Sequence, residues 1–287
     1  MIYLKSFSFP CREREEAYAG SIRRTCYTSF YPLGILSKRQ FERIDFEPVT
    51  ILYGGNGSGK STALHVIADK TGIERESPYN RTSFFEDYVS MCRMETASII
   101  PKGSCIITSD DVFDHMISLR EFNEGIDHKR EEIFDEYLDA KYKKHPFHSM
   151  DDYENLRKSV RARKYSQSCY VKEELGMNAR TFSNGESAYR YFTNKIEEDK
   201  LYLLDEPENS LSAERQEELC RFIEDSARFM GCQFVISTHS PFLLSMRGAK
   251  IYNLDSDPVD VCKWTQLQNV RKVYEFFKKH ERAFEED

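Results

Sequence analysis

The amino-acid sequence predicts an α/β protein built on a mixed, mostly parallel sheet, and three observations support this prediction. An apolar run at 49–53 leads into a glycine-rich segment at 54–59 and then into a helical pattern from Ser61 to Lys70. The last third of the chain alternates strand-length apolar runs with helical patterns, as parallel strands joined by helices do. Short pieces before residue 50 alternate apolar and polar positions, which predicts antiparallel strands at the entry to the sheet.

The same patterns predict the remaining elements. In chain order they are strands at 2–4, 41–46 and 105–108, a helix at 185–197, a strand at 201–204, a helix at 213–230, a strand at 233–237 and a strand around Ile251. A charged stretch at about 110–175 is expected to be a helical insertion, because five apolar residues in it form one helical stripe. These residues are Phe122, Ile126, Ile133, Tyr137 and Leu138. We therefore expect a single domain over residues 1–287, with this insertion and a polar tail at about 270–287.

Composition excludes several classes of protein. The 287 residues include 41 basic and 48 acidic side chains, for a net charge of −7, and 40% are hydrophobic. The chain can therefore form a core, and we expect most of it to be ordered. The acidic balance argues against a protein that coats nucleic acid nonspecifically. Eight cysteines are scattered without zinc-binding spacing. No apolar run approaches the roughly 18 residues that span a bilayer, and the N-terminal segment does not resemble a secretory signal. We expect a cytoplasmic protein with reduced thiols and no membrane partner.

The glycine-rich segment carries the clearest chemistry. Residues 54–62, GGNGSGKST, satisfy the pattern GxxxxGK[ST] between a predicted buried strand and a helix, which is the context that a phosphate-binding loop requires. Glycines let successive N–H groups point at phosphate oxygens, and the helix N-terminus adds positive potential. Lys60 supplies a charge for the β and γ phosphates, and the Ser61 hydroxyl is a ligand for Mg²⁺. The predicted nucleotide-binding residues are Gly54, Asn56, Gly57, Ser58, Gly59, Lys60, Ser61 and Thr62.

A second group of candidate residues follows the apolar run at 201–204. Asp205 and Glu206 come directly after it, and side chains at the carboxyl end of a parallel strand project toward the ligand crevice. One acid can hold Mg²⁺ while its neighbour polarises the attacking water. We expect Asp205 to be the metal ligand and Glu206 the catalytic carboxylate. Acids that merely begin a helix are the alternative, and the phosphate loop makes it the weaker one.

Together these motifs resemble the ABC-type ATPases, and within them the non-transporter branch that includes double-strand-break repair ATPases, structural-maintenance-of-chromosomes heads and overcoming-lysogenization-defect enzymes. Three further segments carry the resemblance. Residues 181–186, TFSNGE, resemble the ABC signature, 207–211, PENSL, resemble its D-loop, and 237–241, STHSP, resemble its switch-histidine segment. The resemblance covers about 50–70 and 180–245. It implies that ATP and Mg²⁺ are bound and that His239 contacts the γ-phosphate.

The resemblance also implies an active site shared between two chains. The signature residues Ser183, Asn184, Gly185 and Glu186 would contact the γ-phosphate held by the opposite subunit of a homodimer with two ATP molecules at its interface. Ser183 and Glu186 also fit a capping box at a helix start, and both interpretations can hold together.

The sequence departs from the transporter pattern in two ways. No glutamine occurs from 62 to 166, so Ser109, Asp110 or Asp111 would take the place of the glutamine that transporter ATPases carry before the signature. The segment between the phosphate loop and the signature is too short for a long coiled-coil arm.

Two further groups of residues leave alternatives open. The basic run at 157–164 is either a nucleic-acid contact or a solvated helix face. Tyr27, Phe30 and Tyr31 are candidates for stacking on adenine.

The sequence thus predicts an ATPase that hydrolyses ATP with Mg²⁺, dimerises head to tail and regulates a separate effector. From the resemblance, that effector would be a nuclease or toxin in a prokaryotic anti-phage defence module, or the role would lie in DNA repair. An ATP-gated scaffold with little turnover, which holds an effector inactive, is the alternative. A transporter nucleotide-binding subunit is a third option, weakened by the missing glutamine.

Overall fold

The computed structural model describes most of the chain. The described residues are 1–22, 26–27, 29–142, 157–158, 160–161, 164, 170–171 and 184–285. They belong to two compact units, the first comprising Met1–Phe113 with Asn184–Asp287 and the second Asp114–Ser183. None of the helices formed by these residues is long and apolar enough to cross a membrane.

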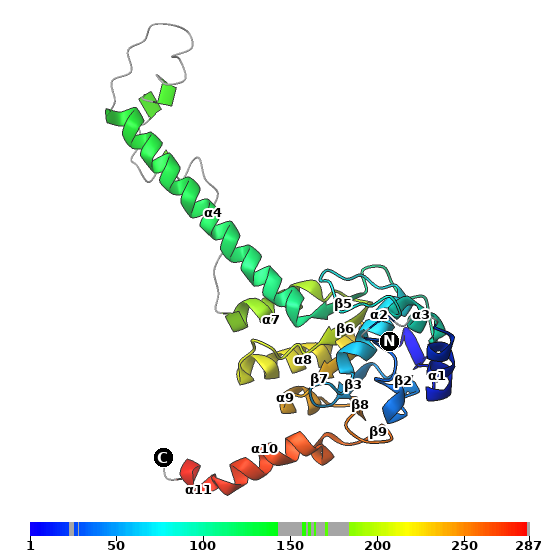
Figure 1. The fold of residues 1–287 in the computed structure, drawn as a ribbon. Helices are drawn as coiled ribbons and strands as arrows, with labels where there is room; N and C mark the ends of the chain where they lie inside the picture. The colour runs from blue at the N-terminus through cyan, green and yellow to red at the C-terminus, as the bar shows by residue number, and fades with distance from the viewer. Residues whose placement is uncertain are drawn as a thin grey trace. The chain divides into compact units, whose positions relative to one another are not determined.

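A six-stranded sheet organises the first unit (Figure 1). Its strands, in spatial order, are β5 (Cys105–Thr108), β6 (Leu201–Asp205), β7 (Gln233–Thr238), β3 (Val49–Tyr53), β8 (Lys250–Asn253) and β9 (Asp260–Val261). The first five run parallel, and β9 pairs antiparallel with β8. Strands β3 and β7 are buried at every position, which is why they read as continuous apolar runs. The predicted mixed, mostly parallel sheet is confirmed.

A second, three-stranded antiparallel sheet contains β1 (Leu4–Ser8) between β2 (Arg43–Asp45) and β4 (Arg93–Thr96). The predicted antiparallel entry strands are therefore confirmed, although the first runs from Leu4 to Ser8 and not over the predicted residues 2–4. The side chain of Gln233, the first residue of β7, joins this sheet to the main one. Its Oε1 accepts hydrogen bonds from the N–H groups of Tyr3 (2.8 Å) and Leu4 (2.9 Å), and its Nε2 donates to the Leu4 carbonyl oxygen.

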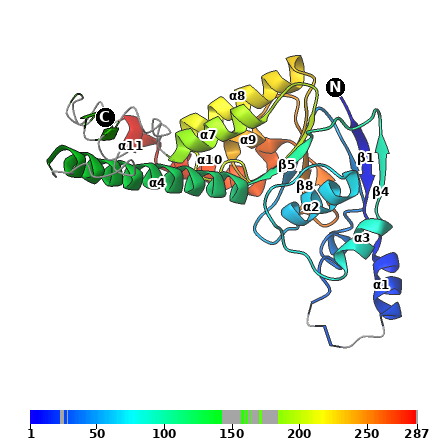
Figure 2. The ribbon, with the colours of Figure 1, turned by 90° about the horizontal axis from the view of Figure 1, so that it is seen from above.

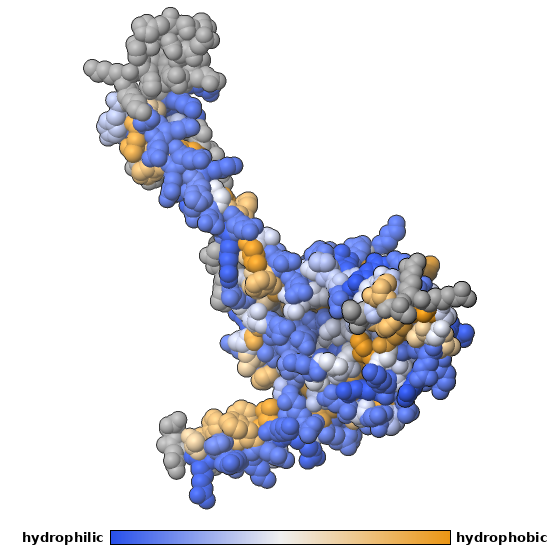
Figure 3. All heavy atoms as spheres, in the orientation of Figure 1, coloured by the Kyte–Doolittle hydropathy of each residue, from blue (hydrophilic) through white to orange (hydrophobic). Residues whose placement is uncertain are grey.

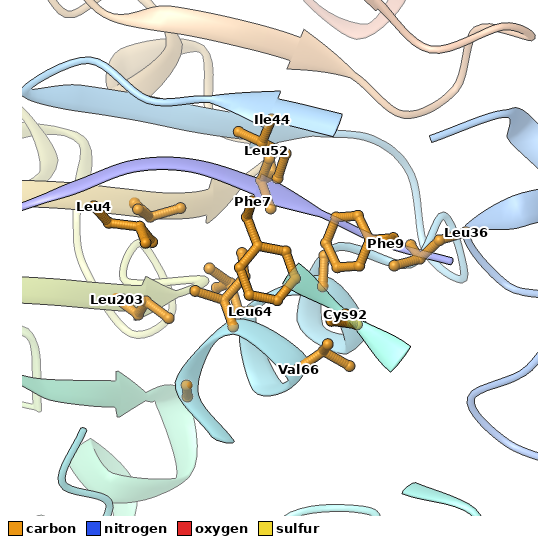
Figure 4. Packing of buried hydrophobic residues seen from close by; sticks show 14 of the residues in the cluster. Leu4, Phe7, Phe9, Leu36, Ile44, Leu52, Leu64, Val66, Cys92 and Leu203 are labelled. Atoms are coloured by element: carbon orange, nitrogen blue, oxygen red, sulfur yellow. The ribbon is translucent and has the colours of Figure 1, made fainter. Parts of the chain in front are cut away.

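The main hydrophobic core lies between the two sheets and helix α2 (Lys60–Thr71). Ala63, Leu64, Val66 and Ile67 of α2 are fully buried. Figure 4 shows Phe7 of β1, Leu64 of α2 and Leu203 of β6 gathered in one cluster. Because residues of both sheets pack with α2 in one core, the phosphate loop that precedes this helix is anchored to that core.

Further helices complete the first unit. They are α1 (Arg12–Ser21), α3 (Phe85–Met91), α7 (Asn184–Lys195), α8 (Ala213–Phe229), α9 (Pro241–Leu244), α10 (Gln268–Lys279) and α11 (Glu281–Glu285), with 3-10 turns at Ser37–Arg39 and Trp264–Gln266. Figure 2 shows α7 and α8 side by side.

The C-terminal segment, expected to be polar, is helical and carries exposed aromatic side chains. Tyr274, Phe276, Phe277 and Phe284 are all more than half exposed, and Figure 3 shows hydrophobic residues along α10. The many lysines and glutamates between these aromatic residues hid this face in the sequence.

Helix α4 (Ser109–Tyr142) starts directly after β5 and supplies most of the described residues of the second unit. Tyr137, Ala140 and Tyr170 form a small cluster there with Ile133, and the rings of Tyr137 and Tyr170 lie 5.4 Å apart. The predicted apolar stripe is confirmed only in part. Tyr137 is buried, whereas two of its other members, Phe122 and Leu138, are exposed.

Candidate nucleotide-binding site

The phosphate loop connects the end of β3 to the start of α2, as predicted. Two of its glycines have left-handed backbone conformations, Gly57 with φ 78° and Gly59 with φ 98°. Gly59 is the N-cap of α2, and a Cβ atom there would lie 2.9 Å from Leu36 Cδ2 and 3.0 Å from Ile35 Cγ2. Both the conformation and the close approach of residues 35–36 therefore require glycine at this position.

The Lys60 side chain contacts the phosphate loop that precedes this residue. Its side chain is only 4% exposed, and Nζ donates to the carbonyl oxygens of Gly54 (2.8 Å) and Gly55 (3.1 Å). Nζ also lies 3.6 Å from Glu206 Oε1. The buried Ser58 Oγ has no hydrogen-bond partner among the described residues. A buried cation beside an unsatisfied hydroxyl fits a phosphate group, which offers oxygens to both.

Asp255, which follows β8, holds the start of this loop. Its carboxylate oxygens accept hydrogen bonds from the Gly55 N–H at 3.0 and 2.9 Å, and Arg39 Nη1 lies 3.5 Å from the same carboxylate. Asp255 is distant in sequence from the glycine-rich segment and belongs to no motif. Sequence analysis therefore missed it.

Asp205 ends β6 beside the start of α2. Its Oδ1 accepts hydrogen bonds from Ser61 Oγ (3.1 Å) and from Ser237 Oγ. Burial raises the pKa of the Asp205 carboxyl, and the hydrogen bonds from Ser237 and Ser61 oppose this rise.

The oxygen atoms at this position suit Mg²⁺ in part. The Ser61 hydroxyl and the Asp205 carboxylate offer the oxygen ligands that Mg²⁺ prefers. The described residues hold no cluster of three or more histidine, cysteine or acidic side chains suited to a metal ion. The fit is therefore to an ion that takes its remaining ligands from nucleotide phosphates and water, as Mg²⁺ commonly does.

Glu206 occupies a strained backbone position at the centre of the site. Its φ of 49° lies in the left-handed region that non-glycine residues seldom adopt. The Glu206 N–H donates to the Ser237 carbonyl oxygen (3.0 Å), and Asn209 Nδ2 donates to Glu206 Oε2 (3.3 Å). Its Oε1 lies 3.6 Å from Lys60 Nζ and 3.8 Å from His239 Nδ1. Strained residues of this kind concentrate at functional sites.

His239 directly follows β7. Its side chain is 46% exposed, and its Nδ1 lies 3.4 Å from Glu208 Oε1. Glu208 Oε1 also accepts hydrogen bonds from the His239 N–H (3.0 Å) and from Thr238 Oγ1 (2.6 Å). Asn269 Nδ2 donates to the His239 carbonyl oxygen (3.1 Å). The structure thus brings the predicted residues of the loop, the acidic strand and the switch segment together, and adds Glu208 and Asn269.

The signature-like segment is described only in part. Ser183 lies outside the described residues, Asn184 begins α7, and Gly185 and Glu186 belong to its first turn. Glu186 Oε1 lies 3.1 Å from Arg190 Nη2 one turn further along the helix. Whether Glu186 also completes the capping box depends on Ser183, so that interpretation stays a prediction.

The residues proposed for the place of the missing glutamine start α4. The register pairs Thr108 of β5 with Asp205 of β6. Ser109 is therefore the residue directly after the one that pairs with Asp205. The Asp111 side chain already has other hydrogen-bond partners. Its buried carboxylate accepts hydrogen bonds from the N–H groups of Thr108 (2.6 Å) and Ser77 (2.8 Å). This leaves Ser109 and Asp110 as the remaining candidates.

The three candidate adenine contacts differ in position. Tyr31 OH donates to Thr62 Oγ1 (3.2 Å), next to the phosphate loop, whereas the rings of Tyr27 and Phe30 pack on Phe84. Tyr31 is therefore the candidate that the structure places beside the loop.

The basic run at 157–164 is described at five of its residues. Lys158 Nζ lies 3.2 Å from Glu136 Oε2, and the Arg161 guanidinium lies 5.5 Å from the centre of the Tyr170 ring. These two basic side chains thus have partners within their own unit, which favours the solvated helix face.

The parallel strands β6, β7 and β3 are neighbours, and their carboxyl ends carry the paired acids, the histidine and the phosphate loop. This order matches the resemblance drawn from the sequence, and it gives the chain a P-loop NTPase fold like that of the ABC-type ATPases. Residues 110–245, from the start of α4 to the end of α9, match the family described as "AAA domain, putative AbiEii toxin, Type IV TA system". No curated protein matches the chain in sequence.

Solved structures similar to this chain include two heads of the structural-maintenance-of-chromosomes (SMC) type. The SMC head domain from Thermotoga maritima is 12% identical, with 91% of this chain and 99% of that chain covered and a TM-score of 0.38. The Smc head domain with an extended coiled coil, bound to the C-terminal domain of ScpA and derived from Pyrococcus furiosus, is 12% identical, with coverages of 97% and 100% and a TM-score of 0.44. A dimeric bacterial ABC transporter cassette is 17% identical, with coverages of 75% and 85% and a TM-score of 0.35.

Proposed function

We propose that this protein hydrolyses Mg·ATP in a head-to-tail homodimer and thereby regulates a separate effector protein in the cytoplasm. The observation that carries the catalytic part is the division of contacts between the two acids. Asp205 is hydrogen-bonded to Ser61, whereas Glu206 faces Lys60 and His239. This division of contacts supports a role for Asp205 at the metal ion and a role for Glu206 at the reacting phosphate and water.

In this proposal each side chain has one task. Lys60 and the N–H groups of residues 55–60 hold the β and γ phosphates, while Ser61 and Asp205 would hold the ion. When bound, Mg²⁺ would offset the negative charge of the phosphates. Glu206 orients the attacking water and accepts its proton, and His239 contacts the γ-phosphate.

The proposed dimer places the start of α7 from one subunit against the γ-phosphate held by the other. Ser183, Asn184, Gly185 and Glu186 would act in this way, because N–H groups at a helix start favour an anion. Hydrolysis separates the γ-phosphate from ADP, and dissociation of the phosphate would open the dimer.

The effector part of the proposal has separate support. The description of the matched family names a toxin–antitoxin system, which supports a role in a defence module of that kind over a role in DNA repair; a separate toxin or nuclease effector is part of the proposal.

A mixing experiment tests the shared active site. Lys60→Ala removes the phosphate contact of one chain and Ser183→Arg blocks the signature of the other, so each variant alone should be inactive. Mixed, they form a heterodimer with one site that has both parts intact, and phosphate release should return in proportion to heterodimer.

The matched control is a mixture of Lys60→Ala with Glu206→Gln. These changes lie in the same half of the site, so no heterodimer site is intact and the mixture should stay inactive. A Ser183→Arg protein that hydrolyses ATP normally as a monomer would contradict the proposal.

A further inference from the structure

Glu208 is a buried carboxylate that the proposed reaction does not use. Its side chain is 6% exposed and lies two residues beyond Glu206. Its Oε1 accepts hydrogen bonds from Thr238 Oγ1 and the His239 N–H, whereas its Oε2 is buried without a hydrogen-bond partner among the described residues. A carboxylate is thus kept in the interior with half of its acceptor capacity unused.

An anchoring role alone does not explain this carboxylate. A glutamine could accept the same two hydrogen bonds through its own Oε1, and burying an amide costs far less than burying a charge. A charged carboxylate that is buried with one oxygen unpaired therefore calls for a nearby hydrogen-bond donor that its negative charge stabilises. The imidazole of His239 is such a group, because its Nδ1 lies 3.4 Å from Glu208 Oε1.

The contacts of His239 show what that charge would achieve. Glu206 Oε1 lies 3.8 Å from the same nitrogen, on the side of Lys60. Nδ1 therefore faces two carboxylates, and the closer one is fixed by its hydrogen bonds to the backbone and to Thr238. A nitrogen that faces carboxylates is favoured as a hydrogen-bond donor, which leaves Nε2 on the opposite edge of the ring.

We propose that Glu208 is a positioning residue for His239: its buried charge holds Nδ1 as the donor to the protein and so leaves Nε2 for the terminal phosphate of the nucleotide. The inference rests on the proposed function, which gives His239 its phosphate contact, and assigns the orientation of the ring to one residue. Without the charge on Glu208, the ring turns between Glu206 and solvent, and the phosphate contact is made in only a fraction of the molecules.

The kinetic test is Glu208→Gln, which keeps an acceptor for Thr238 and the His239 N–H but removes the charge. We expect kcat to fall about 10- to 100-fold, as for other groups that orient a reacting side chain, with KM for ATP within about twofold of the parent. Glu198→Gln is the matched control, because Glu198 is exposed and precedes the amino end of β6, whereas the candidate site lies at the carboxyl end of this strand. This variant should keep the parent kcat.

A double variant separates positioning from a structural role. If Glu208 acts through His239, then adding Glu208→Gln to His239→Ala should lower kcat no further. Unchanged kcat in Glu208→Gln would overturn the proposal, and so would a further loss in the double variant.

A spectroscopic readout keeps the inference testable even if the parent protein shows no turnover. Nitrogen-15 NMR of the His239 ring at about pH 8.5, where an ordinary histidine is neutral, reports which nitrogen carries the proton. The parent should carry it on Nδ1, and Glu208→Gln should shift it toward Nε2. A proton on Nε2 in the parent would overturn the inference, whereas a parent with its proton on Nδ1 but no phosphate release would count against the proposed function alone.

Discussion

Replacing Gly59 by alanine tests how the phosphate loop is held. The substitution places a side chain at φ 98°, which costs about 1–2 kcal/mol for a left-handed residue other than glycine. The added methyl group also comes within 2.9 Å of Leu36 Cδ2 and 3.0 Å of Ile35 Cγ2, and Leu36 is only 1% exposed, so it has little room to move. Overpacking of this kind costs about 1–3 kcal/mol, for an expected total of about 2–5 kcal/mol.

Two other glycines serve as matched controls in urea unfolding. Gly57 has φ 78° but no atom within 4 Å of the added methyl position, so Gly57→Ala should cost only the backbone part, about 1–2 kcal/mol. Gly20 lies in helix α1 with open space around it, and Gly20→Ala should stabilise the protein by about 0.5–1 kcal/mol. If Gly59→Ala and Gly57→Ala destabilise equally, the packing of residues 35–36 against the loop plays no part and the reasoning is refuted.

Three further predictions concern other parts of the chain. Gln233→Leu leaves the buried N–H groups of Tyr3 and Leu4 without hydrogen-bond acceptors, at a cost of about 1–3 kcal/mol each. Urea unfolding should show that the free energy of unfolding falls by about 2–6 kcal/mol. A fall below about 1 kcal/mol would contradict the link between the sheets. Burial and a neighbouring arginine lower the pKa of His65 to about 4. The free energy of unfolding should therefore be highest above about pH 6.5 and fall by up to about 3 kcal/mol as the pH drops toward 4, because the folded protein resists protonation of this ring. Unfolding of His65→Gln should lack this loss, and an unchanged pH dependence in the variant would exclude His65 as its source. If the basic run binds nucleic acid, affinity should fall steeply with salt and be lost when Arg157, Arg161 and Arg163 are replaced by glutamate, whereas equal binding by the triple variant would leave a solvated helix face.

The main sheet and the phosphate loop were predictable because each has a local signal. Strands buried on both faces appear as continuous apolar runs, and the loop motif fixes the strand before it and the helix after it. Strand β4 gave no such signal, since all four of its residues are exposed. It forms because β1 offers it an open edge, and that pairing partner lies about 90 residues away in the sequence.

The candidate site was predictable for the residues that belong to motifs and not for those that support them. Asp255 lies just after β8 and Asn269 lies in the first turn of α10, and only the folded chain brings them to the site. The left-handed backbone of Glu206 likewise results from the turn that leaves β6. Glu208 could be placed in the D-loop-like segment, but its contact with His239 depends on the pairing of β6 with β7.

Phosphate release by the purified protein in Mg·ATP tests the central claim most directly. The parent should release phosphate, and Glu206→Gln should bind ATP with similar affinity but release almost none, because it loses only the carboxylate that accepts the proton of the attacking water. Lys60→Ala should instead lose ATP binding. A Glu206→Gln protein that releases phosphate at the parent rate, or a parent that binds Mg·ATP and releases none, would contradict the account.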